Sequence, residues 1–318
     1  MLFIAGLKAM SKEEKIALLA ASRSLSASAL LGEKASAAGL KIKDKVLGFA
    51  EKAVRKFDYA TAQRIKQFNR SWKWEADTLR SRHIRELELL QGLDESELED
   101  AMKEELARLS GTDPMDSTTK AAEALLVRVG TRAGVAWTNE EDPLSYERKV
   151  VKACIEQIAL DLQRKMKTMT RKEIDELQKQ LDEIISGLGQ REKEAIIKAA
   201  QLSDISGESV LRFWKTTSGV VLAQLVLSSS GFGVYLMLTT IMKAFSLFWG
   251  VTFPFAVYTT ATGVLSFLLS GPFLIAVITG LAGLTFVKTQ NAIDFFMGAM
   301  YIITGYMAVG GVTDESEV

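Results

Sequence analysis

Apolar residues recur at helical spacing along most of the chain. Ile174, Leu177, Leu181, Ile184 and Leu188 follow one another at alternating intervals of three and four residues, which places them on one face of a helix. Only four prolines interrupt a sequence rich in good helix-forming residues. Because no stretch alternates apolar and polar residues as a half-buried strand does, the pattern predicts an all-α fold.

Several helix starts are marked by capping residues. Ser11 and Glu14 form the pattern of a capping box, as do Thr170 and Glu173. We therefore expect helices to begin at these two boxes, and the apolar run that precedes Lys8 to be an N-terminal helix face rather than a secretion signal. Further helices are expected over residues 117–130, 145–169 and 190–202.

Charge is strongly segregated in the helical region expected over residues 40–109. Residues 41–85 contain thirteen basic and five acidic side chains, whereas residues 86–116 contain two basic and eleven acidic ones. One interpretation is an antiparallel hairpin, turning at Gly92, whose two arms neutralise each other. The other is that the basic arm meets phosphate groups.

The last third of the chain is almost free of charge. Between Thr216 and Val287 the only charged residue is Lys243, and a spanning helix needs about 20 predominantly apolar residues. Glycine, serine and proline divide this region into apolar segments over residues 217–229, 234–248, 255–269, 272–287 and 294–311, with a polar turn flanked by Lys288 and Asp294 before the last of them.

These segments predict a C-terminal bundle of apolar transmembrane helices. A bundle that inserts only conditionally, as in helical pore-forming proteins, is the alternative. We favour permanent insertion because a folded bundle outside lipid would need amphipathic helices to cover so long an apolar stretch. The expected division is a charged helical module (1–140), an amphipathic helical connector (141–215), an apolar membrane-embedded region (216–312) and an acidic tail (313–318).

Two features of the apolar region are candidates for membrane chemistry. Ala276, Gly280 and Gly283 place small residues where another helix could approach closely in lipid. Lys243 either extends its amine from a hairpin turn to the headgroups or lines an ion path.

The basic arm carries interleaved aromatic residues. Such a stripe suits anionic lipid; it could also bind nucleic acid, which is the less favoured partner in a protein with so much apolar sequence. The structural interpretation is that the two tryptophans belong to a helical core. The candidate lipid-binding residues are Arg64, Lys66, Arg70, Trp72, Lys73 and Trp74.

Enzymatic chemistry has little support in the sequence. With one histidine and one cysteine, a transition-metal site would need mostly carboxylates. Ser117 and Lys120 match a Ser-x-x-Lys pattern, but the partner motifs are missing and a helix cap accounts for Ser117. We expect no catalytic residues, no cofactor, no metal and no small-molecule substrate.

Residues 145–287 resemble the YaaW-like family of uncharacterised bacterial proteins. The resemblance rests on the polar stretch Lys165–Glu173, the glycine-rich block Gly231–Leu236, the segment Gly250–Tyr258 and the tripeptide Ser270–Pro272. It implies no established activity or site residues.

Two main functional hypotheses follow, and a third, much weaker one is an enzyme that acts on lipid. The first is an integral membrane protein that acts as a membrane-perturbing or channel-like effector, controlled by its helical module. The second is a membrane-anchored scaffold or assembly factor. Basic residues before the first apolar run predict that the module is cytoplasmic and the membrane is the inner one. Expected partners are the bilayer, with anionic lipids, and either further copies of the chain or a cytoplasmic protein.

Overall fold

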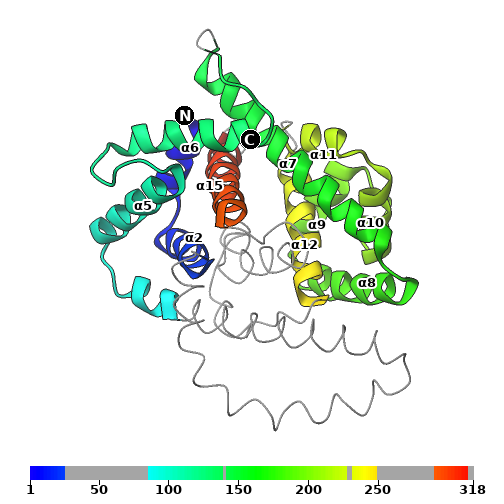
Figure 1. The fold of residues 1–318 in the computed structure, drawn as a ribbon. Coiled ribbons are helices and arrows are strands. Elements are labelled where there is room, and N and C mark those ends of the chain that lie inside the picture. The colour runs from blue at the N-terminus through cyan, green and yellow to red at the C-terminus, as the bar shows by residue number, and fades with distance from the viewer. Residues whose placement is uncertain (26–84, 139–140, 228–230, 249–289, 314–318) are drawn as a thin grey trace, which may run out of the picture.

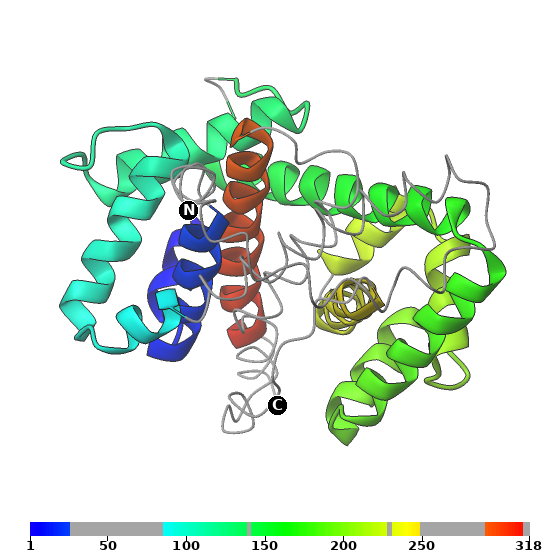
Figure 2. The ribbon, with the colours of Figure 1, turned by 60° about the horizontal axis from the view of Figure 1, so that its bottom comes forward.

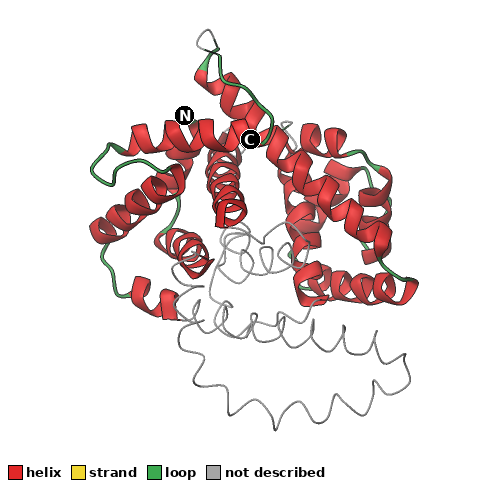
Figure 3. Ribbon diagram, viewed as in Figure 1, coloured by secondary structure: helices red, strands yellow, loops and turns green. Residues whose placement is uncertain are grey.

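The computed structural model describes residues 1–25, 85–138, 141–227, 231–248 and 290–313, and every regular element in these ranges is a helix (Figure 3). This confirms the all-α prediction for the described part of the chain. The labelled helices of the first half are α1 (Leu2–Ala9), α2 (Lys12–Leu25), α5 (Glu95–Ser110), α6 (Thr118–Arg132) and α7 (Pro143–Thr168). Those of the second half are α8 (Arg171–Ser186), α9 (Gln190–Ala200), α10 (Gly207–Thr216), α11 (Gly219–Val226), α12 (Gly231–Phe248) and α15 (Gln290–Thr313).

The predicted helix starts are confirmed by cap geometry. Ser11 Oγ accepts a hydrogen bond from Glu14 N at 3.3 Å, and Glu14 Oε2 accepts one from Ser11 N at 2.7 Å. Thr170 and Glu173 form the same reciprocal pair at the start of α8. Ser117 caps α6. The helix that Ser11 opens is α2, however, because the apolar residues before it form a separate helix, α1.

The break predicted at Gly92 is also confirmed. A helix over residues 85–91 ends in a turn at Gly92, and Asp94 then caps α5 through Glu97 N at 2.9 Å. Acidic residues of α5 pair with α2, since Glu95 lies 3.0 Å from Lys15 Nζ. The basic arm over residues 41–84 lies outside the described residues, so both interpretations of the charge segregation stay predictions.

Helix α15 lies between two groups of helices (Figure 1). It packs most extensively along α1, from the opposite end of the sequence, and also contacts α2, α5, α6 and α7. Figure 2 shows α1 and α15 side by side. Helix α12 packs on α8, α9 and α11. Both apolar helices are therefore covered by other helices of the same chain.

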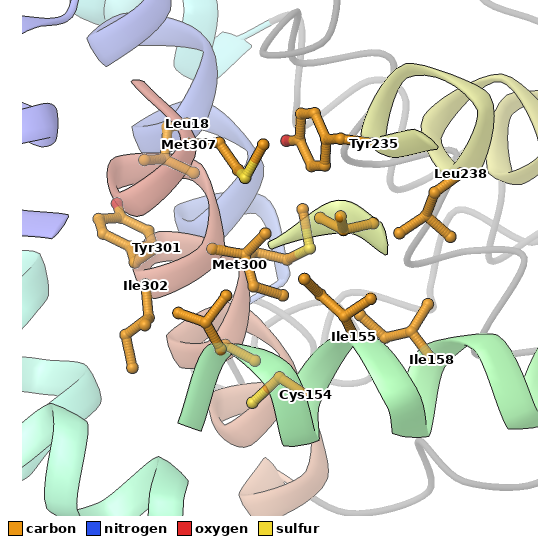
Figure 4. Packing of buried hydrophobic residues seen from close by; sticks show 14 of the residues in the cluster. Leu18, Cys154, Ile155, Ile158, Tyr235, Leu238, Met300, Tyr301, Ile302 and Met307 are labelled. Atoms are coloured by element: carbon orange, nitrogen blue, oxygen red, sulfur yellow. The ribbon is translucent and has the colours of Figure 1, made fainter. Parts of the chain in front are cut away.

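Several of the covering helices are amphipathic, among them α8 and α9, which pack on α12, and α5 and α6, which pack on α15. In α8 the predicted apolar seam is buried, with Leu177, Leu181 and Ile184 at the centre of its inner face, and α8 contacts α12. Helix α15 is apolar on all sides, as expected for a helix that other elements surround. Figure 4 shows side chains of α7, α12 and α15, among them Ile155, Leu238 and Met300, meeting in one core.

The transmembrane prediction finds no support in this part of the chain. None of the described helices combines the length and the apolar character that a membrane crossing requires. The predicted segment over residues 217–229 contains the eight-residue helix α11, while those over 234–248 and 294–311 fall within α12 and α15. The segments over 255–269 and 272–287 lie outside the described residues.

The predicted domain boundaries near residues 140 and 215 stay predictions. Contacts run across both of them, because α15 packs on α1 and α12 packs on α8 and α9. At the first boundary Trp137 lies edge-on against Tyr146 of α7, with ring centroids 4.7 Å apart.

Candidate functional site

Nearly all site residues predicted from the sequence lie outside the described part of the chain. This holds for the small residues Ala276, Gly280 and Gly283 and for the basic-aromatic set between Arg64 and Trp74. Lys243 lies in α12, but its side chain is not among those described. These assignments stay predictions, and the candidate site below was not foreseen.

The site is a buried polar cluster at the start of the apolar helix α15. It consists of Ser22 from α2, Glu105 and Arg108 from α5, and Asp294 from α15, and we call it the Arg108 cluster. Asp294 is the one charged residue in α15, and only 9 % of its surface is exposed.

Arg108 connects the two carboxylates. Its Nη1 donates to Asp294 Oδ1 at 2.8 Å, and its Nη2 donates to Glu105 Oε1 at 2.7 Å. Its Nε adds contacts of 3.1 Å to both oxygens of Glu105. The hydroxyl of Ser22 donates to the same carboxylate. Side chains separated by 186 residues in sequence are thereby joined.

The electrostatics favour the ionised form of the cluster. Burial alone would lower the pKa of the Arg108 guanidinium, but the hydrogen bonds and charges of Glu105 and Asp294 outweigh burial and raise that pKa above its ordinary value. A buried carboxylate that loses its partner is costly. Removing Arg108 would therefore leave Glu105, 4 % exposed, and Asp294 without this partner.

Further polar groups of α15 continue inward from the cluster. The Tyr301 hydroxyl is buried beside Ser22 and Glu105. On the other side of the cluster, the Arg132 guanidinium lies 5.1 Å from the centre of the Phe295 ring, within the range of a cation–π interaction. Arg108 of α5 and Arg132 of α6 thus both contact the first turns of α15.

At its other end α15 is fixed by backbone proximity to α1. A Cβ atom on Gly6 would lie 1.7 Å from Gly305 O, and one on Gly305 would lie 2.2 Å from Phe3 O. Only glycine permits so close an approach of two helix backbones. Helices α1 and α15 therefore form one tightly packed pair.

Helix α1 is in turn fixed by a buried carboxylate of α7. Glu147 is fully buried, and its two oxygens accept hydrogen bonds from Leu2 N at 2.8 Å and Phe3 N at 2.5 Å. Burial raises the pKa of Glu147, and the two backbone donors offset part of that rise. The interaction satisfies donors that a helix N-terminus otherwise leaves unpaired.

The sequence reading of Asp294 was wrong. It placed Asp294 beside a polar turn, whereas Asp294 lies in the first turns of α15 and pairs with Arg108. The available signal was the isolation of this charge within an apolar helix, since such charges usually pair with another group. The partner itself could not be read from the sequence.

Two kinds of reactive centre can be checked among the described residues, a nucleophilic thiol and a metal site. Burial raises the pKa of the Cys154 thiol to about 12, so the thiol stays protonated at neutral pH and is a poor nucleophile. No group of three or more metal-ligating side chains occurs within the described ranges. The arrangement instead fixes an apolar helix to its neighbours by a polar cluster, a glycine contact and a cap.

Comparison with known proteins gives no relative: no family model, no curated protein and no solved structure matches the chain. The resemblance to the YaaW-like family accordingly stays a prediction.

Proposed function

We propose that this protein is a membrane-perturbing effector whose apolar helices are covered by its own amphipathic helices until they meet lipid. The observation that carries the proposal is the environment of α15, a 24-residue helix with one charged residue. Most of its side chains between Asp294 and Ala308 are buried, and Asp294 pairs with Arg108. Apolar helices normally bury against lipid or protein. In this structure, other helices of the same chain pack around α15.

The covered state changes the preference between the two modes of insertion. The sequence favours permanent insertion because amphipathic helices would otherwise be needed to cover the apolar stretch. In the structure the amphipathic helices α8 and α9 pack on α12, and α5, α6 and α7 pack on α15. Conditional insertion therefore becomes the preferred form of the proposal. The 44 residues from Ala244 to Val287, which contain no charge, would supply further apolar surface.

The proposed location is the cytoplasmic face of the inner membrane. In this scheme the Arg108 cluster determines how readily α15 leaves its neighbours, because two buried carboxylates depend on one guanidinium. The cluster is then a positioning element rather than a catalytic one.

The proposal predicts that weakening the cluster promotes leakage from liposomes. For Arg108→Gln we expect release of an entrapped dye at a protein concentration roughly tenfold lower than for the wild type, since breaking a buried ion pair is strongly destabilising. Asp294→Asn is the milder second variant. It should release dye at a protein concentration between those needed for Arg108→Gln and for the wild type. Thermal unfolding followed by circular dichroism checks that each variant is folded.

Arg191→Gln is the matched control, because Arg191 is exposed on α9 and forms no ion pair with any described side chain. It should behave as the wild type. Vesicles that stay tight at high concentrations of wild type and of both cluster variants would contradict the proposal. Stable membrane association without leakage would instead favour the membrane-anchored scaffold.

A further inference from the structure

The outer face of α11 exposes large apolar side chains. Val220 and Val221 are each 42 % exposed, and Leu160 of α7 beside them is 36 % exposed. The two helices are in close contact here, since a Cβ atom on Gly219 would lie 3.0 Å from Leu160 Cγ. An apolar patch of this kind on a helix surface often marks an interaction site.

A basic recess lies at the other end of the same pair of helices. It has a volume of about 380 Å³, and its lining includes Arg148, Lys149 and Lys152 of α7 and Gln224 of α11. Arg148 Nη2 donates a hydrogen bond to the backbone oxygen of Leu227, the C-cap residue of α11, at 3.2 Å. The recess therefore combines three cations with a polar amide.

The charges of the recess are only partly compensated. Lys149 Nζ lies 2.6 Å from Glu141, while Lys152 forms no ion pair with the side chains that the structure describes. Glu156 is half-buried one turn further along α7. Lys215, exposed at the end of α10, adds a positive charge close to the start of α11.

Helical spacing makes the recess and the apolar patch one continuous surface. Gln224 lies three and four residues after Val221 and Val220, so all three share a face of α11. Lys152 and Leu160 lie eight residues apart on α7, which also places them on one side. We call this surface the α7–α11 face and define it by Arg148, Lys149, Lys152, Leu160, Val220 and Val221.

We propose that the α7–α11 face binds the surface of a bilayer containing anionic lipid. The recess receives lipid phosphate groups, and Val220 and Val221 enter the boundary between headgroups and acyl chains. The cations match the anionic headgroup layer, and the exposed apolar side chains match the acyl-chain layer beneath it. Nucleic acid would use the cations but would leave the valines without a role. The inference rests on the proposed function. It adds the class of lipid that is bound and the protein surface that meets the membrane first.

Vesicle flotation with the full chain tests the α7–α11 face. We compare vesicles of phosphatidylcholine alone with vesicles in which about a third of the lipid is phosphatidylglycerol. The wild type should bind the anionic vesicles more tightly. Lys149→Gln combined with Lys152→Gln should weaken that binding by roughly 25-fold, since each lysine near an anionic surface contributes about fivefold. Val220→Ser combined with Val221→Ser should weaken it by roughly tenfold.

The matched control removes two charges from α8, by Lys172→Gln and Lys179→Gln, away from α11 in Figure 1. The control should bind within about twofold of the wild type, because the charges that it removes lie away from the α7–α11 face and are screened by salt. Equal binding by the control and the lysine variant overturns the inference, as does the absence of vesicle binding, or binding to a DNA duplex in place of vesicles.

Dye leakage measured on the same samples separates the two proposals. Binding that depends on the α7–α11 face without leakage supports the inference and contradicts the proposed effector function. Leakage that is unchanged in the lysine and valine variants supports the effector function and overturns the inference. Loss of both binding and leakage in these variants, with native thermal unfolding, supports both.

Discussion

Two buried carboxylates, Glu147 and Asp294, fix helices that are far from them in sequence. Glu147 lies on the inner face of α7 and accepts backbone hydrogen bonds from α1. Asp294 lies on α15 and accepts from the guanidinium of Arg108. Both side chains are buried, where an acid without its partner would be destabilising. Each therefore specifies one arrangement of its neighbours.

The raised pKa of Glu147 makes a pH-dependent contribution to stability. Because the folded pKa lies above the unfolded one, this contribution is fully present below the unfolded pKa and is lost as the pH rises through the folded pKa. The wild type should therefore gain stability relative to Glu147→Gln as the pH is lowered from 7 to about 4. Urea unfolding at a series of pH values measures the difference.

Glu123→Gln is the control for this titration, because Glu123 is exposed on α6. Its stability relative to the wild type should change little with pH. A difference between Glu147→Gln and the wild type that stays constant over the same range would contradict the assigned direction. Glu147→Ala should cost about 1–3 kcal/mol near neutral pH, since two buried backbone donors lose their acceptors.

At the scale of elements, the pairing of α1 with α15 is the feature most dependent on shape. The two helices approach at Gly6 and Gly305 so closely that a side chain on either would overlap backbone atoms of the other helix. Hydrophobicity alone would allow α15 to slide or rotate along its neighbours, because burial of apolar surface is non-directional. The glycine contact and the Arg108 cluster at the two ends of α15 select one register.

Gly305→Ala should lower the free energy of unfolding by about 1–3 kcal/mol, the usual cost of forcing extra volume into a packed interface. Thermal unfolding measured by circular dichroism checks it. Gly187→Ala is the control, because Gly187 at the end of α8 has an ordinary φ of −78° and a Cβ there would lie 3.4 Å from the nearest atom. Equal stability of the two variants would show that α1 and α15 do not pack as described.

At the scale of the whole molecule, the apolar helices α12 and α15 are part of the same core as the charged helices. Buried residues of α1, α5, α7, α8, α12 and α15 belong to one contiguous cluster. Helices α1 and α15, which lie near opposite ends of the sequence, therefore contribute to a single core. A separate N-terminal domain would instead keep its core without the last hundred residues.

This arrangement predicts the behaviour of a chain that ends at Leu211. Without α12 and α15, the inner faces of α1, α8 and α9 lose their partners, and we expect the cooperative thermal transition to disappear. A chain that ends at Thr313 should unfold as the full chain does. If the shorter chain melts cooperatively near the full-length temperature, the predicted boundary at residue 215 separates two independent domains.

Local interactions account for what the sequence by itself determined. The helical class, the caps at Ser11, Ser117 and Thr170, the turn at Gly92 and the apolar seam of α8 all depend on residues three or four positions apart. Such contacts form in the same way in any tertiary context. For this reason they could be predicted from periodicity and capping chemistry.

Only the tertiary structure decided what covers the apolar helices. An apolar stretch is satisfied equally by lipid and by the inner faces of other helices, and its composition does not distinguish them. The partners of Asp294 and of α15, namely Arg108 and α1, are distant in sequence. Such pairings are selected by the fit of backbone and charge in three dimensions, which no local pattern encodes.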